Sequence, residues 1–362
     1  MLKTLDQNDL TKNVIKSTSN TLIVGRIGSG KSQIFRKLEG SILKKISDDP
    51  SAKLVVYDIN GFSYKCWPDE EDTTLMFSIV HNKSFFWHIA EDLIDDKHIE
   101  IFTTSMLDII LNFDKNEYFY NKLYKILKSS ILECRYTFGK FWRWKDLSEK
   151  LSKYLQESNG YMLIILKELI EVFNLCQEKE YINTNKIFSI TEWTKAKIFD
   201  SVHAQKSRND ISNVRTVFLV NTETRNAPEA AIINAFIRLS TIMANKNSNI
   251  NISMNHSETL NYSIDKNIKN KFCKLIIGKE KFNTCIDSDI LIKEDFDSVI
   301  ISKLGVGDTA PNGINIPYVL NSMLGVSAEG IQTIYFDSIN KETYKVLWNY
   351  INLNVKRELT NN

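Results

Sequence analysis

The feature that most constrains the fold is a glycine-rich loop near the N-terminus, set between an apolar run and a helical pattern. Residues 21–38 have the sequence TLIVGRIGSGKSQIFRKL, in which the apolar residues after the loop recur at helical spacing. Residues 25–32 match the G-x-x-x-x-G-K-[ST] pattern of a phosphate-binding loop completely. A second buried strand is expected over residues 52–58. Strand, loop, helix and strand in this order predict an α/β fold with a mainly parallel sheet.

The loop has the residue types needed to hold a nucleoside triphosphate, as in a P-loop NTPase. Glycines let successive backbone N–H groups turn inward around phosphate oxygens, and the following helix adds its dipole. We expect Lys31 to reach the β- and γ-phosphates and the Ser32 hydroxyl to bind Mg²⁺. ATP and Mg²⁺ are therefore the expected cofactors. The expected nucleotide-binding residues are Gly25, Arg26, Ile27, Gly28, Ser29, Gly30, Lys31, Ser32 and Gln33.

Hydrolysis needs more than the loop, because an acidic residue must help to hold the metal and a carboxylate usually orients the attacking water. Asp58 follows the apolar residues LVVY and has the local form of such a metal-binding residue. A second acid is expected after a later strand, but the sequence NINISMNH ends in Asn255 and His256. An asparagine carries no charge. His256 is a candidate base near neutral pH, with a buried structural imidazole as the alternative. Nucleotide binding is predicted, and hydrolysis is left open.

The character of the chain changes twice along its length. We expect a first part of the NTPase domain over residues 1–84, an all-helical insert over 85–186 and the second part of the NTPase domain over 187–362. Helices are predicted over 31–46, 85–111, 117–135, 145–157, 160–178 and 227–244. Further strands are predicted over 215–220, 249–254, 272–277 and 331–336.

Composition excludes several classes of protein. The net charge is 46 − 44 = +2, so any surface that binds DNA must be a local patch. The five cysteines are widely spaced, which argues against a disulfide scaffold and a zinc site and is typical of a reducing cytoplasm. The N-terminal residues have no apolar core of a secretory signal. No apolar run approaches the roughly 18 residues that a membrane span needs. We expect a cytoplasmic protein with no membrane span of its own.

Residues 134–145, CRYTFGKFWRWK, alternate aromatic and basic side chains. Such a pattern can bind nucleic acid, because bases stack on aromatic rings while Arg and Lys hold the phosphates. The alternative is that the aromatic rings fill the core of the helical insert while the cations extend into solvent. We favour the second interpretation.

Taken in order, these motifs resemble the cytoplasmic ATPase region of TraD-type conjugative coupling proteins, which are type IV secretion receptors of the FtsK/HerA-like class. The phosphate loop with its flanks is similar to that of the family, and it is the most specific of the landmarks. The others are a tyrosine-aspartate-x-x-glycine segment, a strand leading to a tryptophan, the segment that ends the insert, and a strand followed by a long helix. The segments that carry the resemblance are 22–33, 55–67, 77–93, 186–195 and 215–244.

The resemblance covers residues 18–260 and implies a RecA/FtsK-like motor core with an all-α domain. It further implies a homo-hexameric ring that handles DNA at the cytoplasmic face of the inner membrane, together with type IV secretion or relaxosome components. On this basis the chain is expected to be an ATP-binding motor for DNA transfer. The strandedness of the DNA does not follow from it.

The sequence also departs from the family pattern. The family carries N-terminal membrane helices, whereas here only 24 residues precede the phosphate loop. The resemblance places the family's Asp-Glu pair at Asn255 and His256, so both acids are replaced. A second hypothesis is therefore a degenerate nucleotide-binding adaptor or assembly component with little or no ATPase activity. A third, a P-loop kinase of small molecules, fits the landmarks less well.

Overall fold

The computed structural model describes two compact units. The first contains the described residues up to Tyr57 and from Asn249 to Tyr350, and the second those from Asp58 to Ser248. The described residues are 3–16, 20–49, 51–59, 61–66, 73–111, 117–182, 186–195, 211–221, 227–255, 270–279, 296–305, 316, 318–337 and 339–350.

The first unit is built on a sheet whose centre is parallel. Its strand order is β1-β13-β12-β10-β2-β9-β8-β3, and the run from β10 to β3 is parallel throughout. β12 is antiparallel to both β10 and β13. The strands are β1 (Lys3–Leu5), β2 (Asn20–Val24), β3 (Ala52–Ile59), β8 (Asn249–Met254), β9 (Cys273–Lys279), β10 (Phe296–Ile301), β11 (Gly325–Ser327), β12 (Gly330–Asp337) and β13 (Glu342–Trp348).

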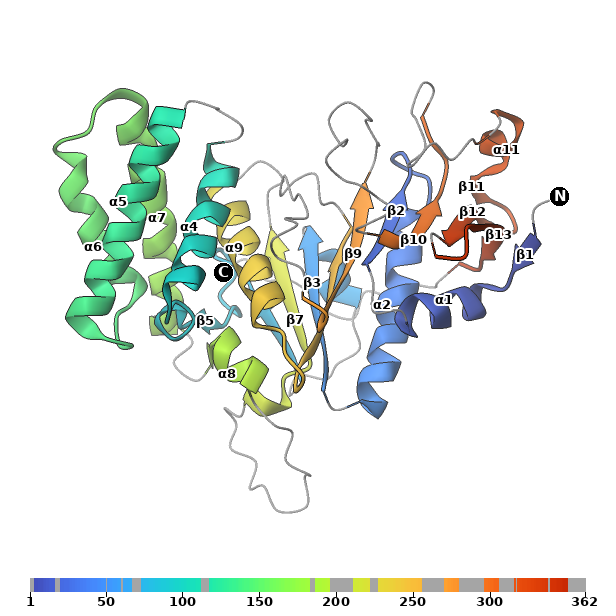
Figure 1. The fold of residues 1–362 in the computed structure, drawn as a ribbon, viewed down its shortest axis with the longest axis horizontal. Helices are drawn as coiled ribbons and strands as arrows, with labels where there is room; N and C mark the ends of the chain where they lie inside the picture. Colours follow the sequence, from blue (N-terminus) through green and yellow to red (C-terminus); the bar gives the residue numbers. More distant parts are fainter. Residues whose placement is uncertain are drawn as a thin grey trace, which may run out of the picture. The chain divides into compact units, whose positions relative to one another are not determined.

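Three helices belong to this unit: α1 (Gln7–Lys16), α2 (Lys31–Asp48) and α11 (Tyr318–Met323). α2 begins directly after the phosphate loop and lies along the sheet (Figure 1). Its apolar side chains recur at helical spacing and are buried, so hydrophobic burial fixes the helix that follows the loop. These buried residues are Ile34, Phe35, Leu38, Ile42 and Ile46.

The second unit combines two strand pairs with a helical bundle. β4 (Thr74–Phe77) pairs in parallel with β7 (Thr216–Asn221), and β5 (Phe86–Trp87) with β6 (Ile187–Phe188). The helices α4 to α7 lie side by side in Figure 1, each packed on the next. The helices are α3 (Phe62–Cys66), α4 (Asp96–Ile110), α5 (Glu117–Phe138), α6 (Trp144–Ser152), α7 (Gly160–Ile182), α8 (Ile190–Lys195) and α9 (Ala227–Met243), with 3-10 turns at Ile89–Glu91, Lys153–Leu155 and Ile211–Asn213.

These units do not coincide with the expected division at residues 84 and 186. The helix α9 was assigned to the NTPase domain, but it packs along α4 of the helical region. Arg238 on α9 forms an ion pair with Asp108 on α4 at 3.0 Å, and the Asn234 amide donates to the Ser105 carbonyl at 2.9 Å. Because α9 is buried against α4, it belongs to the second unit, which also contains β4, β7 and helices α4 to α7. Residues 86–87 also form a strand, and α4 begins only at Asp96.

A buried aspartate joins the segment that enters the helical region to the segment that leaves it. Asp92 is fully buried, and one of its carboxylate oxygens accepts hydrogen bonds from Trp87 Nε1 at 2.6 Å and Ile190 N at 2.9 Å. The other accepts from Ser189 Oγ at 2.8 Å and Thr191 N at 2.7 Å. Burial raises the pKa of Asp92, while these four hydrogen bonds act in the opposite direction. One side chain therefore ties together residues almost a hundred positions apart.

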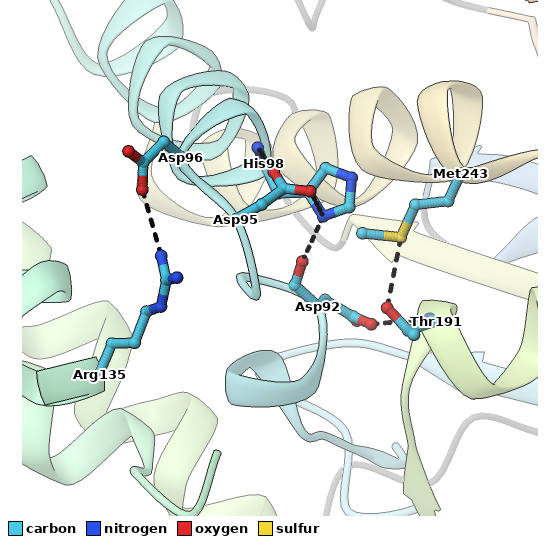
Figure 2. Close-up of polar contacts among 7 residues, drawn as sticks. All are labelled: Asp92, Asp95, Asp96, His98, Arg135, Thr191 and Met243. Atoms are coloured by element: carbon cyan, nitrogen blue, oxygen red, sulfur yellow. Dashed lines mark hydrogen bonds and ion pairs between the residues drawn. The ribbon is translucent and has the colours of Figure 1, made fainter. Parts of the chain in front are cut away.

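The surroundings of Asp92 extend this connection to two helices (Figure 2). His98 on α4 donates from Nδ1 to the Asp92 carbonyl oxygen at 3.0 Å, and the Thr191 hydroxyl contacts the Met243 sulfur at 3.7 Å. Nearby, Arg135 of α5 pairs with Asp96 of α4 at 3.2 Å, in a more exposed position. The segments that enter and leave the helical region are thus held together by a buried polar network and not by apolar packing alone.

Candidate functional site

The phosphate loop leaves β2 at Val24 and leads into α2 at Lys31. Gly28 and Gly30 have φ angles of 76° and 92°, in the left-handed region that glycine adopts without strain. A Cβ atom at Gly30 would also lie 2.8 Å from the Ile331 side chain. The loop closes on itself, because Ser29 N donates to the Arg26 carbonyl at 3.2 Å. Two glycines of the motif are therefore required by the backbone conformation.

The two strands beside β2 hold the start of the loop in place. Gly25 N donates to the Lys279 carbonyl at the end of β9 at 3.1 Å, and Arg26 N donates to the Lys303 carbonyl just after β10 at 2.8 Å. The Ser302 hydroxyl donates to the Ser29 carbonyl at 2.6 Å. The loop is thus fixed at the carboxyl edge of the parallel strands, which is where ligands bind in open α/β sheets.

Lys31 is buried inside the loop despite its charge. The residue is only 5% exposed. Its Nζ atom donates to the Gly25 carbonyl oxygen and, at 3.4 Å, to the Arg26 carbonyl oxygen. Phosphate oxygens are stronger acceptors for an ammonium group than carbonyl oxygens, because they carry negative charge. The ammonium group is therefore positioned for a polyphosphate at this edge of the sheet.

Asn255 lies next to the hydroxyl expected to bind the metal. It directly follows β8, which only β9 separates from β2, and its Nδ2 donates to Ser32 Oγ at 2.8 Å. The Asn255 Oδ1 atom is buried and has no hydrogen-bond partner among the described residues. A Cβ atom at Gly278 would lie 2.3 Å from the Asn255 carbonyl oxygen, so glycine is needed on β9 for this approach. His256, the other residue expected here, lies outside the described residues.

Asp58 has a different set of contacts. It is buried near the end of β3, and β9 and β8 both lie between β3 and β2 in the sheet. One carboxylate oxygen accepts from Ser63 N at 2.9 Å and the other from Tyr64 N at 2.7 Å. These bonds satisfy backbone donors in the first turn of α3, as a helix cap does. They give Asp58 a structural role, and its binding of a metal stays a prediction.

The aromatic and basic segment 134–145 divides into two groups. Cys134, Trp142 and Trp144 are fully buried, which confirms the core interpretation for part of the segment. Tyr136 and Phe141 are 94% and 72% exposed. Phe138, the last residue of α5, is 44% exposed. The interpretation that the aromatic rings fill the core therefore does not hold for Tyr136, Phe138 and Phe141.

Cations accompany these exposed rings. Lys140 Nζ lies 5.6 Å from the centre of the Phe141 ring, and Arg143 pairs with Glu180 at 3.2 Å. Residues 134–145 contain four basic and no acidic side chains. We call the exposed residues Tyr136, Phe138, Lys140, Phe141 and Arg143 the α5–α6 patch.

Several residues that hold the phosphate loop were not predicted. These residues are Ser302, Lys303 and Ile331. They lie beyond residues 18–260, which the resemblance to the family covers. For Ser302 and Lys303 the signal was the preceding run VII at residues 299–301, which is apolar and entirely β-branched and so is typical of a short buried strand. Ile331 begins the strand predicted over 331–336, but nothing in its sequence context pointed to the loop. Across the described residues, His, Cys, Asp and Glu side chains form no group of three or more able to hold a metal ion. No helix in the part of the chain that the structure describes is long and apolar enough to span a bilayer.

Comparisons with known proteins agree with this fold. Three solved structures of a bacterial conjugative coupling protein have the same fold at 10–11% sequence identity. The unbound monoclinic form of TrwBdeltaN70 has a TM-score of 0.63, with 99% of this chain and 96% of that chain covered. Plasmid coupling protein TrwB in complex with the GTP analogue GDPNP has a TM-score of 0.62, with 98% and 95% covered. The trigonal form of TrwBdeltaN70 with sulphate has a TM-score of 0.60, with 99% and 95% covered.

Sequence comparison identifies the family. No curated protein sequence matches the chain. A family model described as the type IV secretion-system coupling protein DNA-binding domain matches residues 10–251, which is more than half of the 362 residues. The chain therefore belongs to the family of type IV secretion-system coupling proteins, as the order of its motifs predicted.

Proposed function

We propose that this coupling protein binds ATP in the loop of residues 25–32 and uses it as a motor for DNA transfer through a conjugation system. The observation that carries the proposal is the phosphate loop itself, with Lys31 buried among its carbonyl groups at the edge of a parallel sheet. Backbone N–H groups of the loop and the α2 N-terminus would bind the phosphates. The complex of the structurally similar TrwB with GDPNP supports a nucleotide as ligand.

The residues present fit a magnesium ion only in part. Ser32 offers a hydroxyl oxygen, but its described neighbour Asn255 offers a neutral amide. A bound Mg²⁺ would supply positive charge against the negative charge that develops on the phosphates during phosphoryl transfer. In this chain Ser32 would contact the metal, and Lys31 would stabilise the phosphate oxygens directly. Asp58 remains a candidate for further negative charge.

The alternative is a nucleotide-binding adaptor or assembly component with slow or no turnover. It is favoured by Asn255, which stands where the resemblance places an acid. ATP turnover of the purified chain, measured with and without DNA and over a range of protein concentrations, distinguishes the two. DNA-stimulated hydrolysis that disappears in a Lys31→Ala variant supports the motor. Tight ATP binding without turnover at any concentration supports the adaptor.

The partners follow from family membership and are part of the proposal. The chain would work as a homo-hexamer in the cytoplasm, held at the inner membrane by type IV secretion or relaxosome components. In ring-shaped assemblies of this kind each subunit repeats one heterologous contact around a closed ring. Protein concentration should then raise ATPase activity per subunit until the ring is complete, which sedimentation of the same samples can follow.

We further propose that the α5–α6 patch contacts DNA. Changing Tyr136 and Phe141 together to alanine should weaken binding of a fluorescent single-stranded oligonucleotide by roughly tenfold or more, because each stacked base contributes about 1–3 kcal/mol. The matched control is Tyr118→Ala, which removes a ring that is 69% exposed at the opposite end of α5. Equal affinity of the double variant and the control would refute this role. Parallel titrations with duplex DNA would show whether the patch prefers unpaired bases.

A further inference from the structure

We propose that this site binds ATP nearly as well without Mg²⁺ as with it, because a neutral amide replaces the carboxylate expected beside Ser32. The inference rests on the proposed function, since it concerns the same nucleotide in the same loop. On this inference, ATP binding does not require the metal. Mg²⁺ would bind to the phosphates but would contribute little to the affinity of the protein for ATP.

The first step is the contact between Asn255 and Ser32. The Asn255 Nδ2 group donates to Ser32 Oγ at 2.8 Å and so engages a lone pair of the oxygen that a metal would use. An amide nitrogen cannot bind a cation, and an amide oxygen carries no charge. In either orientation of the amide, the protein adds no negative charge at this position. Hard cations such as Mg²⁺ prefer carboxylates and waters, so the contact is unfavourable for the metal.

The second step is the charge of the surrounding sheet edge. Arg26, Lys31, Lys279 and Lys303 stand at or just beyond the carboxyl ends of β2, β9 and β10. Asp and Glu are absent from the described residues at the ends of β10, β2, β9 and β8, namely 302–305, 25–32, 278–279 and 255.

The acid described on the next strand of the sheet is Asp58, near the end of β3, and both of its carboxylate oxygens accept backbone hydrogen bonds. Among the described residues, the strand ends from β10 to β8 therefore have basic side chains and no acidic one.

The third step is the balance of charge on the phosphates. A triphosphate usually meets one protein cation and one metal ion, with a nearby carboxylate that favours the metal. Without that carboxylate, the net charge of the protein groups around the site is more positive by one unit, and the electrostatic potential there is higher. A positive potential stabilises the uncomplexed polyphosphate and destabilises a divalent cation next to it. The chain's own cations therefore do part of the neutralisation that the metal does elsewhere.

The test is a set of ATP-binding titrations of the full chain by calorimetry, in buffer with excess Mg²⁺ and in buffer with EDTA. Wild-type affinity should change by less than about threefold between the two buffers, because the described neighbour of Ser32 is a neutral amide and not a carboxylate. The Asn255→Asp variant should bind ATP roughly tenfold more weakly in EDTA and regain affinity in Mg²⁺, because the new carboxylate repels free phosphate and attracts the metal. The matched control is Asn247→Asp, which makes the same change at an exposed residue before the amino end of β8 and should follow the wild type in both buffers.

Each outcome bears on the inference separately from the proposed function. A loss of more than about tenfold in wild-type affinity on removal of Mg²⁺ would overturn the inference and leave ATP binding intact. Equal behaviour of Asn255→Asp and wild type in both buffers would also overturn it, given matching circular dichroism spectra. If the wild type binds no ATP in either buffer, the proposed function fails, and the inference fails with it.

Discussion

A Lys31→Ala variant is expected to bind ATP roughly 10- to 100-fold more weakly than the wild type, because hydrogen bonds to charged groups contribute about 1.5–3 kcal/mol each. The Lys31 ammonium group is the buried cation of the phosphate loop, held by the Gly25 and Arg26 carbonyl groups. Its loss removes the charge that compensates the β- and γ-phosphates, while the backbone donors of the loop remain. Calorimetric titration with ATP measures the effect directly.

A second lysine on the same helix provides the control. Lys44 is exposed near the other end of α2, so Lys44→Ala removes the same charge from the same element without touching the loop. Its ATP affinity should stay within about twofold of the wild type, because exposed charges at this separation are largely screened. If Lys31→Ala binds as tightly as Lys44→Ala, the nucleotide is not held by the loop of residues 25–32.

The sequence predicted the elements whose signals are local. The phosphate loop, the strand before it and the helix after it are contiguous, and each has its own pattern of glycine or apolar spacing. The strand expected over residues 249–254 coincides with β8, because its apolar residues alternate with polar ones at the period of a strand. The position of Asn255 beside Ser32 is consistent with the resemblance to coupling proteins, which placed a family motif there.

The rest depends on contacts between distant segments, which local patterns do not report. β10, which pairs with β2 and helps to hold the phosphate loop, follows a polar stretch and was not predicted. The edge strand β1 is three residues long and exists only because β13 pairs with it. The helix-capping role of Asp58 was not predicted, since a carboxylate after an apolar strand has the same local form whether it binds a metal or caps a helix. The packing of α9 against α4 was not predicted either, because it joins segments far apart in the sequence.

Replacing Asp92 by alanine should destabilise the second unit by about 4 kcal/mol or more, a loss typical of broken buried networks. The carboxylate accepts four hydrogen bonds, from Trp87, Ser189, Ile190 and Thr191. The Ser189 hydroxyl can turn to another acceptor, but the indole and two backbone N–H groups are fixed. Each buried donor left without a partner costs about 1–3 kcal/mol. Urea denaturation followed by tryptophan fluorescence is a direct measurement, because Trp87 bonds to the altered side chain.

The neighbouring aspartate shows whether the effect belongs to the network or to lost charge. Asp96 lies four residues further on, and its exposed carboxylate pairs with Arg135 (Figure 2). Asp96→Ala removes the same charge, and it should cost at most about 1 kcal/mol because exposed ion pairs and helix-end charges contribute little. Ser189→Ala should cost about 1–2 kcal/mol, because it removes one of the four donors to the carboxylate and the acceptor of the Glu192 N–H in α8. If Asp92→Ala is no less stable than Asp96→Ala, Asp92 does not hold the two ends of the helical region together, and apolar packing does.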